Sequence, residues 1–205
     1  MIKSRYRTIK TSIPNIKSLK LINDLKKFEA RGMHGQVPIL WNKADNFQVH
    51  DYSGNKWIDF SSTILVANVG HSNKKIISEI KKLLNKPLIH TYSYVSKERY
   101  EYLKKLIKFT PEYLQKAFLL SSGSEATEAA LKIMRYYGKY KKKQKNIILS
   151  FEGNWHGRSL GAEMMGGKMN LKNWITFHDK NIIHMPFPYP WDKDVKLDSA
   201  KFFKK

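Results

Sequence analysis

Two short segments of the chain combine small, charged and aromatic side chains at spacings that suit an anionic, ring-containing ligand. The first runs Leu120-Ser121-Ser122-Gly123-Ser124-Glu125, directly before a predicted helix. The first turn of a helix leaves backbone N–H groups without partners and carries the positive end of the helix dipole. Gly123 lets the backbone approach a ligand closely, and Ser122 and Ser124 add hydroxyl donors. This turn could therefore hold a phosphate group.

The same turn can equally be interpreted as an ordinary helix cap. Ser122 and Glu125 have the Ser-x-x-Glu spacing of a capping box. Physical reasoning from these residues leaves the cap and the phosphate site open as alternatives. The glycine spacing matches neither the P-loop nor the GxGxxG fingerprint, so the turn does not indicate a nucleotide.

The second segment places an aromatic ring, an imidazole and a guanidinium on one short turn, Trp155-His156-Gly157-Arg158. Trp155 could stack on a flat heterocycle, and Arg158 could form a two-pronged contact with a carboxylate. The simpler alternative is that Trp155 fills the core, His156 is buried and hydrogen-bonded, and Arg158 is a surface cation. The occurrence of all three beside a phosphate-binding turn favours a ligand site.

Both segments follow stretches that have the pattern of buried strands, residues 117–120 and 147–151. A predicted helix over residues 124–137, closed by Gly138, connects them. This strand–helix–strand alternation predicts an α/β domain with a mainly parallel sheet flanked by helices. Loops that follow parallel strands open at the same edge of the sheet, so we expect the two segments to meet there.

The helix between these strands is amphipathic, with one apolar stripe: Ala126, Ala129, Ala130, Ile133, Met134 and Tyr137. On another face, Glu128 and Lys132 have the order and spacing of an i,i+4 ion pair.

Upstream, the pattern predicts four further features. An amphipathic helix is expected within residues 15–30. A β-hairpin is expected from residues 47–50 and 56–60, with turn residues between them. Two more helices are expected near residues 73–85 and 96–108.

Composition excludes several classes of protein. The chain has 205 residues, 41% of them hydrophobic, which is typical of a globular protein. It has no cysteine, so disulfides, a thiolate nucleophile and cysteine-ligated metals are excluded. No apolar stretch approaches the ~20 residues that a membrane span requires. The histidines lack the i,i+4 spacing of a helical metal site, and Asp192 and Asp194 are interpreted as a solvated turn, so no metal site is expected.

The net charge of +21, from 38 basic and 17 acidic residues, raises nucleic-acid binding as an alternative. Only six of the basic residues are arginine, the side chain best suited to phosphate and guanine contacts. The lysines are scattered except for one cluster: Lys139, Lys141, Lys142, Lys143 and Lys145. That cluster lies between a predicted helix and a predicted strand, where a solvated loop is expected.

Several motifs together resemble the class III pyridoxal-phosphate aminotransferases. The run SSGSEATEAALKIMR resembles their glycine–Ser/Thr–Glu–Ala signature, and FEGNWHGRSLGA resembles their aromatic–His–Gly–Arg segment. VHDYSGNKWIDF, followed by Asn68-Val69-Gly70-His71, resembles their entry hairpin and Gly-His turn. The agreement extends in order from about Gly35 to Pro190. One departure is Thr127, where many relatives carry asparagine.

The resemblance implies the large domain of a fold-type-I transferase, here incomplete, with a basic helical segment at residues 1–33 and the aminotransferase part at 34–205. It implies five residues around pyridoxal 5′-phosphate: Ser122, Gly123, Ser124, Trp155 and His156. Of these, Gly123 and Ser124 hold the phosphate and Trp155 stacks on the ring. Arg158 takes the position that binds a substrate carboxylate, which argues against the glutamate-1-semialdehyde aminomutase branch.

The reaction implied is amino-group transfer from an amino acid or amine to an oxo acid or aldehyde, usually by a homodimer. In the family, the lysine that holds the cofactor as a Schiff base lies well downstream, so it is expected beyond Lys205 and residues 1–205 alone are expected to be inactive. Alternatives are an aminomutase or decarboxylase relative, or a non-catalytic basic fragment that binds nucleic acid. We expect a cytoplasmic protein, with a mitochondrial one as the alternative because residues 1–20 are basic and lack acids.

Overall fold

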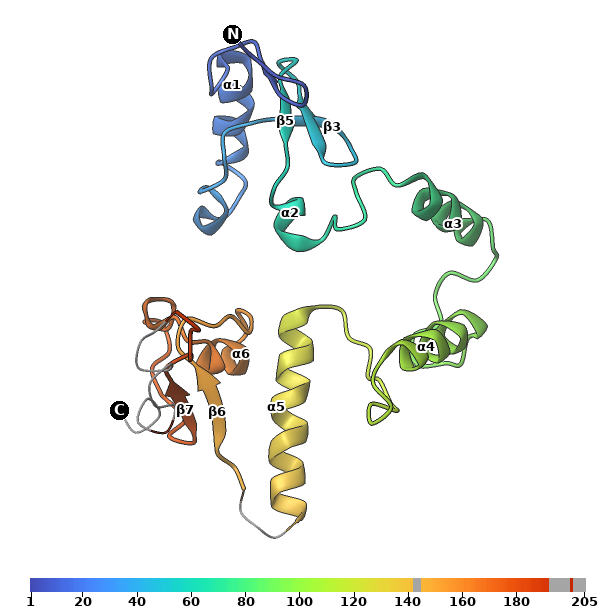
Figure 1. Cartoon of the computed structure of the whole chain (residues 1–205), viewed down its shortest axis with the longest axis vertical. Helices are drawn as coiled ribbons and strands as arrows, with labels where there is room; N and C mark the ends of the chain where they lie inside the picture. Colours follow the sequence, from blue (N-terminus) through green and yellow to red (C-terminus); the bar gives the residue numbers. More distant parts are fainter. Residues whose placement is uncertain (142–144, 192–199, 201–205) are drawn as a thin grey trace. The chain divides into compact units, whose positions relative to one another are not determined.

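The computed structural model describes residues 1–141, 145–191 and 200. Expectations for Lys142, Lys143, Asp192 and Asp194 therefore lie outside the described residues. The chain forms two compact units, Met1–Ser96 and Lys97–Lys205, and each is described by itself (Figure 1).

The first unit contains a five-stranded antiparallel sheet with strand order β1-β2-β5-β4-β3. Its strands are β1 (Ile2–Lys3), β2 (Thr8–Ile9), β3 (Trp41–Asp45), β4 (Gln48–Asp51) and β5 (Lys56–Ile58). The predicted hairpin is confirmed as β4 and β5, which pair with Val49 opposite Trp57. Strands β1, β2 and β3 were not predicted. Two of them have two residues each, and the sequence of β3, Trp-Asn-Lys-Ala-Asp, does not alternate apolar and polar residues.

A buried polar cluster joins the N-terminal segment to the turn of this hairpin. Asn55, only 1% exposed, accepts the backbone N–H groups of Lys10 and Thr11 at 2.7 and 3.2 Å. Its amide nitrogen donates to Asp51 Oδ2 at 2.8 Å, which also accepts the indole N–H of Trp57 at 3.0 Å. Because every one of these polar atoms is paired, their burial is compatible with a stable fold.

Three helices belong to the first unit: α1 (Ile16–Leu25), α2 (Ser62–Leu65) and α3 (Lys74–Leu84), together with a short 3₁₀ turn, Arg31–Met33. Asparagine side chains cap α1 and α3 by accepting hydrogen bonds from the first helical turn. The predicted helix near 73–85 is confirmed as α3. The helix predicted within 15–30 is shorter than that range, because the chain turns after Leu25.

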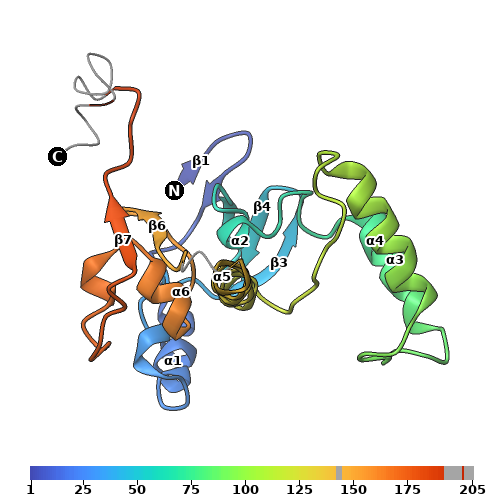
Figure 2. The same cartoon turned by 90° about the horizontal axis from the view of Figure 1, so that it is seen from below.

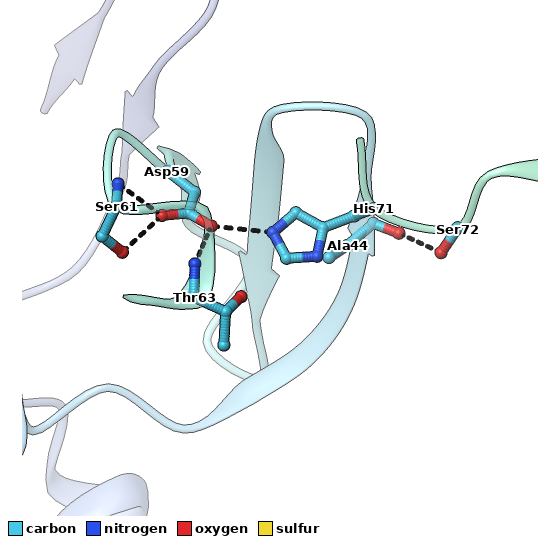
Figure 3. Close-up of polar contacts among 6 residues, drawn as sticks. All are labelled: Ala44, Asp59, Ser61, Thr63, His71 and Ser72. Carbon is cyan, nitrogen blue, oxygen red and sulfur yellow. Dashed lines mark hydrogen bonds and ion pairs between the residues drawn. The ribbon is translucent and has the colours of Figure 1, made fainter. Parts of the chain in front are cut away.

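The segment between β5 and α3 is held by one carboxylate, Asp59 (Figure 3). It accepts the imidazole N–H of His71 at 2.8 Å, the N–H and O–H of Ser61 at 2.9 and 2.8 Å, and the N–H of Thr63 at 3.1 Å. The bond from His71 is the main reason that the pKa of Asp59 falls to about 2, against a smaller rise from burial. The side chains of Asp59 and His71 are only 5% and 13% exposed.

The turn that begins after Ser61 has unusual backbone angles. All four residues of α2, from Ser62 to Leu65, have φ between 48° and 69°, so this turn is left-handed. Such angles cost about 1–2 kcal/mol for each residue with a side chain. Asp59 therefore fixes a turn that the sequence alone would not favour.

The second unit contains α4 (Lys97–Phe109), α5 (Gly123–Tyr140), β6 (Ile148–Phe151), α6 (Leu160–Met165), a 3₁₀ turn (Met169–Leu171) and β7 (Ile182–Met185). Strands β6 and β7 lie side by side in both views (Figures 1 and 2). They pair in parallel with Ile148 opposite Ile182. The predicted α4, α5 and β6 are confirmed, as is parallel pairing.

The core of this unit lies between β6, α6 and the segment that follows α6. Along β6 buried and exposed residues alternate, with Ile148 and Ser150 buried. Ala162 and Met165 of α6 and Ile175 are also buried. Because α6 packs both on α5 and beside β7, it fixes the loop that connects it to β6.

Two predictions for this unit are wrong. Residues 117–120 form no strand and are exposed, because among the described residues no neighbouring strand supplies the hydrogen bonds that a strand needs. Gly138 does not close the helix, which continues to Tyr140. Gly138 is buried instead because its backbone touches the carbonyl of Lys145, where a Cβ atom has no room.

Candidate functional site

The first turn of α5 is capped as predicted. Ser122 Oγ accepts the N–H of Glu125 at 3.2 Å, and Glu125 Oε2 accepts the N–H groups of Ser121 and Ser122 at 2.9 and 3.1 Å. This reciprocal capping box is confirmed. The box uses Ser122 but not the backbone N–H groups of Gly123 and Ser124, so the cap and an anion site are compatible.

Three donors remain at this helix start. Among the described residues, no hydrogen bond takes the backbone N–H of Gly123 or of Ser124. The hydroxyl proton of Ser124 is also available, since Ser124 Oγ acts as an acceptor in its protein contact. The space beside Gly123 is open, because a Cβ atom there would meet nothing within 4 Å. The turn therefore presents converging donors to a ligand that can approach the backbone.

The structure brings the two predicted segments together at Ser124. The backbone N–H of Arg158 donates to Ser124 Oγ at 3.3 Å. Gly157 has φ of +133° and lies so close to Ser124 that a Cβ atom would overlap its side chain. A glycine is therefore needed here both for its backbone angle and for close approach. The turn with the arginine and the turn with the free donors form one surface.

Glu128, one helical turn after Ser124, does not form the expected pair with Lys132 in the part of the chain that the structure describes. Its Oε1 instead accepts three hydrogen bonds at the start of α6: from Ser159 Oγ at 2.6 Å, Gly161 N at 2.8 Å and Ala162 N at 3.0 Å. Burial raises the pKa of Glu128, but these hydrogen bonds lower it by more, so it lies below its ordinary value. Sequence reasoning missed this role because it depends on where α6 packs.

Trp155 presents an accessible ring beside this surface. Its side chain is 53% exposed, which contradicts the alternative that it fills the core. The guanidinium carbon of Arg158 lies 5.4 Å from the ring centroid, and Lys168 Nζ lies 5.7 Å from it. Both distances are within the range of cation–π contacts. The aromatic ring and the arginine are therefore adjacent.

His156 is held in a small polar network below the loop. Its Nε2 lies 2.8 Å from Asn154 Nδ2 and 3.4 Å from Ser150 Oγ, and the Ser150 hydroxyl donates to the carbonyl of Met165 at 2.5 Å. The Asn154 amide also donates to Ser150 Oγ at 2.8 Å, so Asn154 and Ser150 together hold the imidazole. His156 also lines a cavity of about 450 Å³ between α5 and β6, together with Thr127, Ala130 and Leu149.

Thr127, the departure from the family pattern described above, has a local role. Its hydroxyl donates to the carbonyl of Gly123 at 2.9 Å, which adds a side-chain bond to the first turn of α5. This contact leaves the N–H groups of that turn free.

A buried lysine, Lys172, packs against the end of α6. Lys172, 5% exposed, donates to the carbonyl of Met164 at 2.9 Å and lies 3.0 Å from His184 Nε2. Burial lowers the pKa of Lys172, and the nearby charge of Glu163 offsets part of that effect. These contacts fix the end of α6 and do not reach the surface formed by Ser124 and Arg158.

The described residues contain no group of three or more His, Cys, Asp or Glu side chains arranged to hold a metal ion. Within the same residues, no helix is long and apolar enough to cross a membrane.

Solved structures with the same fold are transaminases. An (S)-enantioselective omega-transaminase from Thermomicrobium roseum matches with a TM-score of 0.76 at 20% identity, covering 94% of this chain and 44% of that one. A transaminase from Virgibacillus matches with a TM-score of 0.73 at 22% identity, covering 83% and 41%. The fold is therefore that of part of the large domain of a fold-type-I pyridoxal-phosphate transferase.

The chain belongs to the class III aminotransferase family, whose family model matches residues 30–204. Mitochondrial acetylornithine aminotransferase of Saccharomyces cerevisiae is 34% identical over 155 residues, covering 73% of this chain and 36% of that protein. Succinylornithine transaminase of Photorhabdus laumondii is 32% identical over 146 residues, covering 71% and 36%. The chain thus spans little more than a third of the length of these relatives.

Class III aminotransferases depend on pyridoxal phosphate, and the residues present fit part of that group. The free N–H groups of Gly123 and Ser124, with the Ser124 hydroxyl, are donors suited to a phosphate at a helix start. The open space at Gly123 permits close approach. Trp155 supplies an exposed aromatic ring suited to a planar group, with the cations of Arg158 and Lys168 beside it.

Proposed function

We propose that this chain supplies the cofactor-phosphate and substrate-carboxylate contacts of a pyridoxal-phosphate-dependent aminotransferase. The reaction is transfer of an amino group from an amino acid or amine to an oxo acid or aldehyde. The observation that carries the proposal is the contact of the Arg158 backbone with Ser124, which joins an anion-binding helix start to a turn bearing an arginine and an aromatic ring.

Each of these residues has a defined task. Gly123 and Ser124 bind the phosphate through backbone and hydroxyl donors, and Trp155 covers one face of the ring. Arg158 orients a substrate carboxylate through its planar pair of N–H donors. Pyridoxal phosphate, when bound, supplies the electron-withdrawing ring on which amino-group transfer depends.

Other parts of the proposal rest on the family resemblance. From that resemblance we expect the lysine that carries the cofactor beyond Lys205, and we expect residues 1–205 alone to bind ligand without turnover. We expect the whole enzyme to be a homodimer and to be cytoplasmic, with a mitochondrial location as the alternative. Ornithine-type substrates are the first to test, since the acetylornithine and succinylornithine enzymes are the relatives described above.

The test uses pyridoxamine 5′-phosphate, which lacks the aldehyde that would react with lysines throughout this basic chain. Binding is measured by quenching of tryptophan fluorescence at 0.15 M and 0.5 M salt, with pyridoxamine as the ligand that lacks the phosphate. Ser124→Ala removes one donor together with the acceptor of the Arg158 N–H, and Ser121→Ala is the matched control in the same exposed turn. Trp155→Phe tests whether quenching reports on this ring.

We expect the phosphate-bearing ligand to bind at least about tenfold more tightly than pyridoxamine, since charge-assisted hydrogen bonds contribute about 1.5–3 kcal/mol each. Ser124→Ala should weaken it, Ser121→Ala should not, and added salt should reduce this preference only modestly. Equal binding of both ligands, or loss of all binding at 0.5 M salt, would overturn the proposal in favour of non-specific attraction to a basic chain.

A further inference from the structure

Two acceptors one turn apart on α5 hold successive parts of a single loop. Ser124 Oγ accepts the N–H of Arg158. Glu128 Oε1 accepts from the donors that follow: Ser159 Oγ, Gly161 N and Ala162 N. Residues four apart on a helix lie on one face, so Ser124 and Glu128 anchor the loop on both sides of the arginine side chain.

We propose that Glu128 is a positioning residue that fixes Arg158 relative to the phosphate-binding turn at Gly123 and Ser124. It contacts neither ligand and acts through the start of α6. This inference rests on the proposed function, because that function assigns phosphate and carboxylate binding to the residues that Glu128 positions. The loop geometry that Glu128 controls can nevertheless be measured without any ligand.

A carboxylate suits this position because α6 lacks a cap of its own. The helix has only six residues, and Ser159 at its N-cap position makes no side-chain capping bond. The N–H groups of Gly161 and Ala162 would otherwise lack acceptors. A negative charge is favourable at a helix N-terminus, and the hydrogen bonds from α6 that lower the pKa of Glu128 stabilise its charged form.

The packing around Glu128 shows that α6 is placed against it closely. A Cβ atom at Gly161 would overlap the Glu128 carboxylate and would lie 2.9 Å from Leu131 Cδ2. A side chain at this position would therefore displace the Glu128 carboxylate or the Leu131 side chain. Movement of Glu128 therefore moves the start of α6, and with it the residue two positions before α6, Arg158.

The experiment compares Glu128→Ala, Glu128→Asp and Glu128→Gln in the full chain. Hydrogen–deuterium exchange of the segment 155–162 is measured without ligand, and affinity for pyridoxamine 5′-phosphate is measured separately. Glutamine keeps the accepting oxygen at the same reach, whereas aspartate is one methylene too short. Lys132→Ala controls for the i,i+4 partner expected from the sequence. Asp179→Asn, which breaks the ion pair with Arg135 elsewhere on α5, controls for a general loss of stability.

We expect Glu128→Ala and Glu128→Asp to speed exchange at Gly161 and Ala162 at least about tenfold. They should also weaken binding of pyridoxamine 5′-phosphate about threefold to tenfold, because Trp155, which covers the ring of this ligand, lies on the same loop as Arg158. Glu128→Gln should restore most of both properties. Lys132→Ala should change neither, and Asp179→Asn should lower the unfolding midpoint while leaving this exchange unchanged.

The possible results distinguish failure of the positioning role of Glu128 from failure of the proposed function. Unchanged exchange in Glu128→Ala, or an equal increase in Asp179→Asn, would overturn the positioning role. Lack of phosphate-dependent binding by the unmodified chain would instead overturn the proposed function, while faster exchange in Glu128→Ala would still support the anchoring of the loop.

Discussion

The backbone N–H of Arg158 donates to the hydroxyl oxygen of Ser124, a residue 34 positions earlier in the chain. This bond is possible because Gly157, beside Arg158, has no side chain to separate the loop from α5. The two segments with the most distinctive chemistry in the sequence thereby share one hydrogen bond.

The first prediction concerns this glycine. Gly157→Ala should destabilise the unit by at least about 2 kcal/mol, because an alanine there has both an unfavourable φ and an overlap with Ser124. Gly153→Ala is the matched control, since Gly153 also has positive φ but open space around it. It should cost only about 1 kcal/mol. Denaturant unfolding measures both, and equal costs would contradict the role of close packing.

A pH effect is predicted at Asp59. Its pKa of about 2 in the folded state is lower than the ordinary 3.8, so the contribution of its charge to stability is present above about pH 4. That contribution is lost as the pH falls towards 2. The difference in unfolding free energy between the unmodified chain and Asp59→Asn should therefore shrink over this range. A difference that stays constant from pH 5 to pH 2 would show that the carboxylate charge is not what holds His71 and the left-handed turn.

Asn55 should be needed to attach the N-terminal segment. Asn55→Ala leaves the N–H groups of Lys10 and Thr11 without their acceptor and should cost about 2–3 kcal/mol. Trypsin should then cleave faster after Arg7 and Lys10. Asn68→Ala, which removes an exposed asparagine bonded to the carbonyl of Leu65, is the control and should leave that cleavage unchanged.

The last prediction reverses the usual effect of alanine in a helix. Gly138→Ala raises helix propensity by about 1 kcal/mol, yet it should destabilise the chain because the new methyl group overlaps the backbone at Lys145. We expect a net loss of about 1–2 kcal/mol. Lys139→Ala, at the exposed neighbouring position, should be neutral or slightly stabilising. A stabilised Gly138→Ala variant in thermal unfolding would contradict the packing.

The sequence predicted the elements whose periodicity is strong, and the structure shows why others escaped prediction. The hairpin of β4 and β5, the helices α3 to α5 and strand β6 follow clear alternation or helical spacing. Residues 117–120 have an equally good strand pattern but no neighbouring strand among the described residues. Strands β1 and β2 have two residues each, too few for a pattern.

In the candidate site, too, contacts between residues close in the sequence could be predicted, whereas contacts between distant residues could not. The capping box at Ser122 depends on residues three apart, so it could be predicted from local sequence. The true partners of Glu128 lie more than 30 positions away, so local spacing favoured Lys132 instead. The meeting of Ser124 and Arg158 was expected from two parallel strands, but residues 117–120 form no strand. The close approach of Gly157 to Ser124 brings the two segments together instead.

The parallel pairing of β6 with β7 has a consequence for how the site forms. Ile148 pairs with Ile182, so everything between them, including Trp155, Arg158 and α6, belongs to one crossover connection. Closing such a long loop has an entropic cost that must be met before the strand contacts form, and non-local pairing of this kind slows folding. The arginine turn and the strand pair should therefore become ordered together, and an isolated peptide of the turn should not reproduce its conformation.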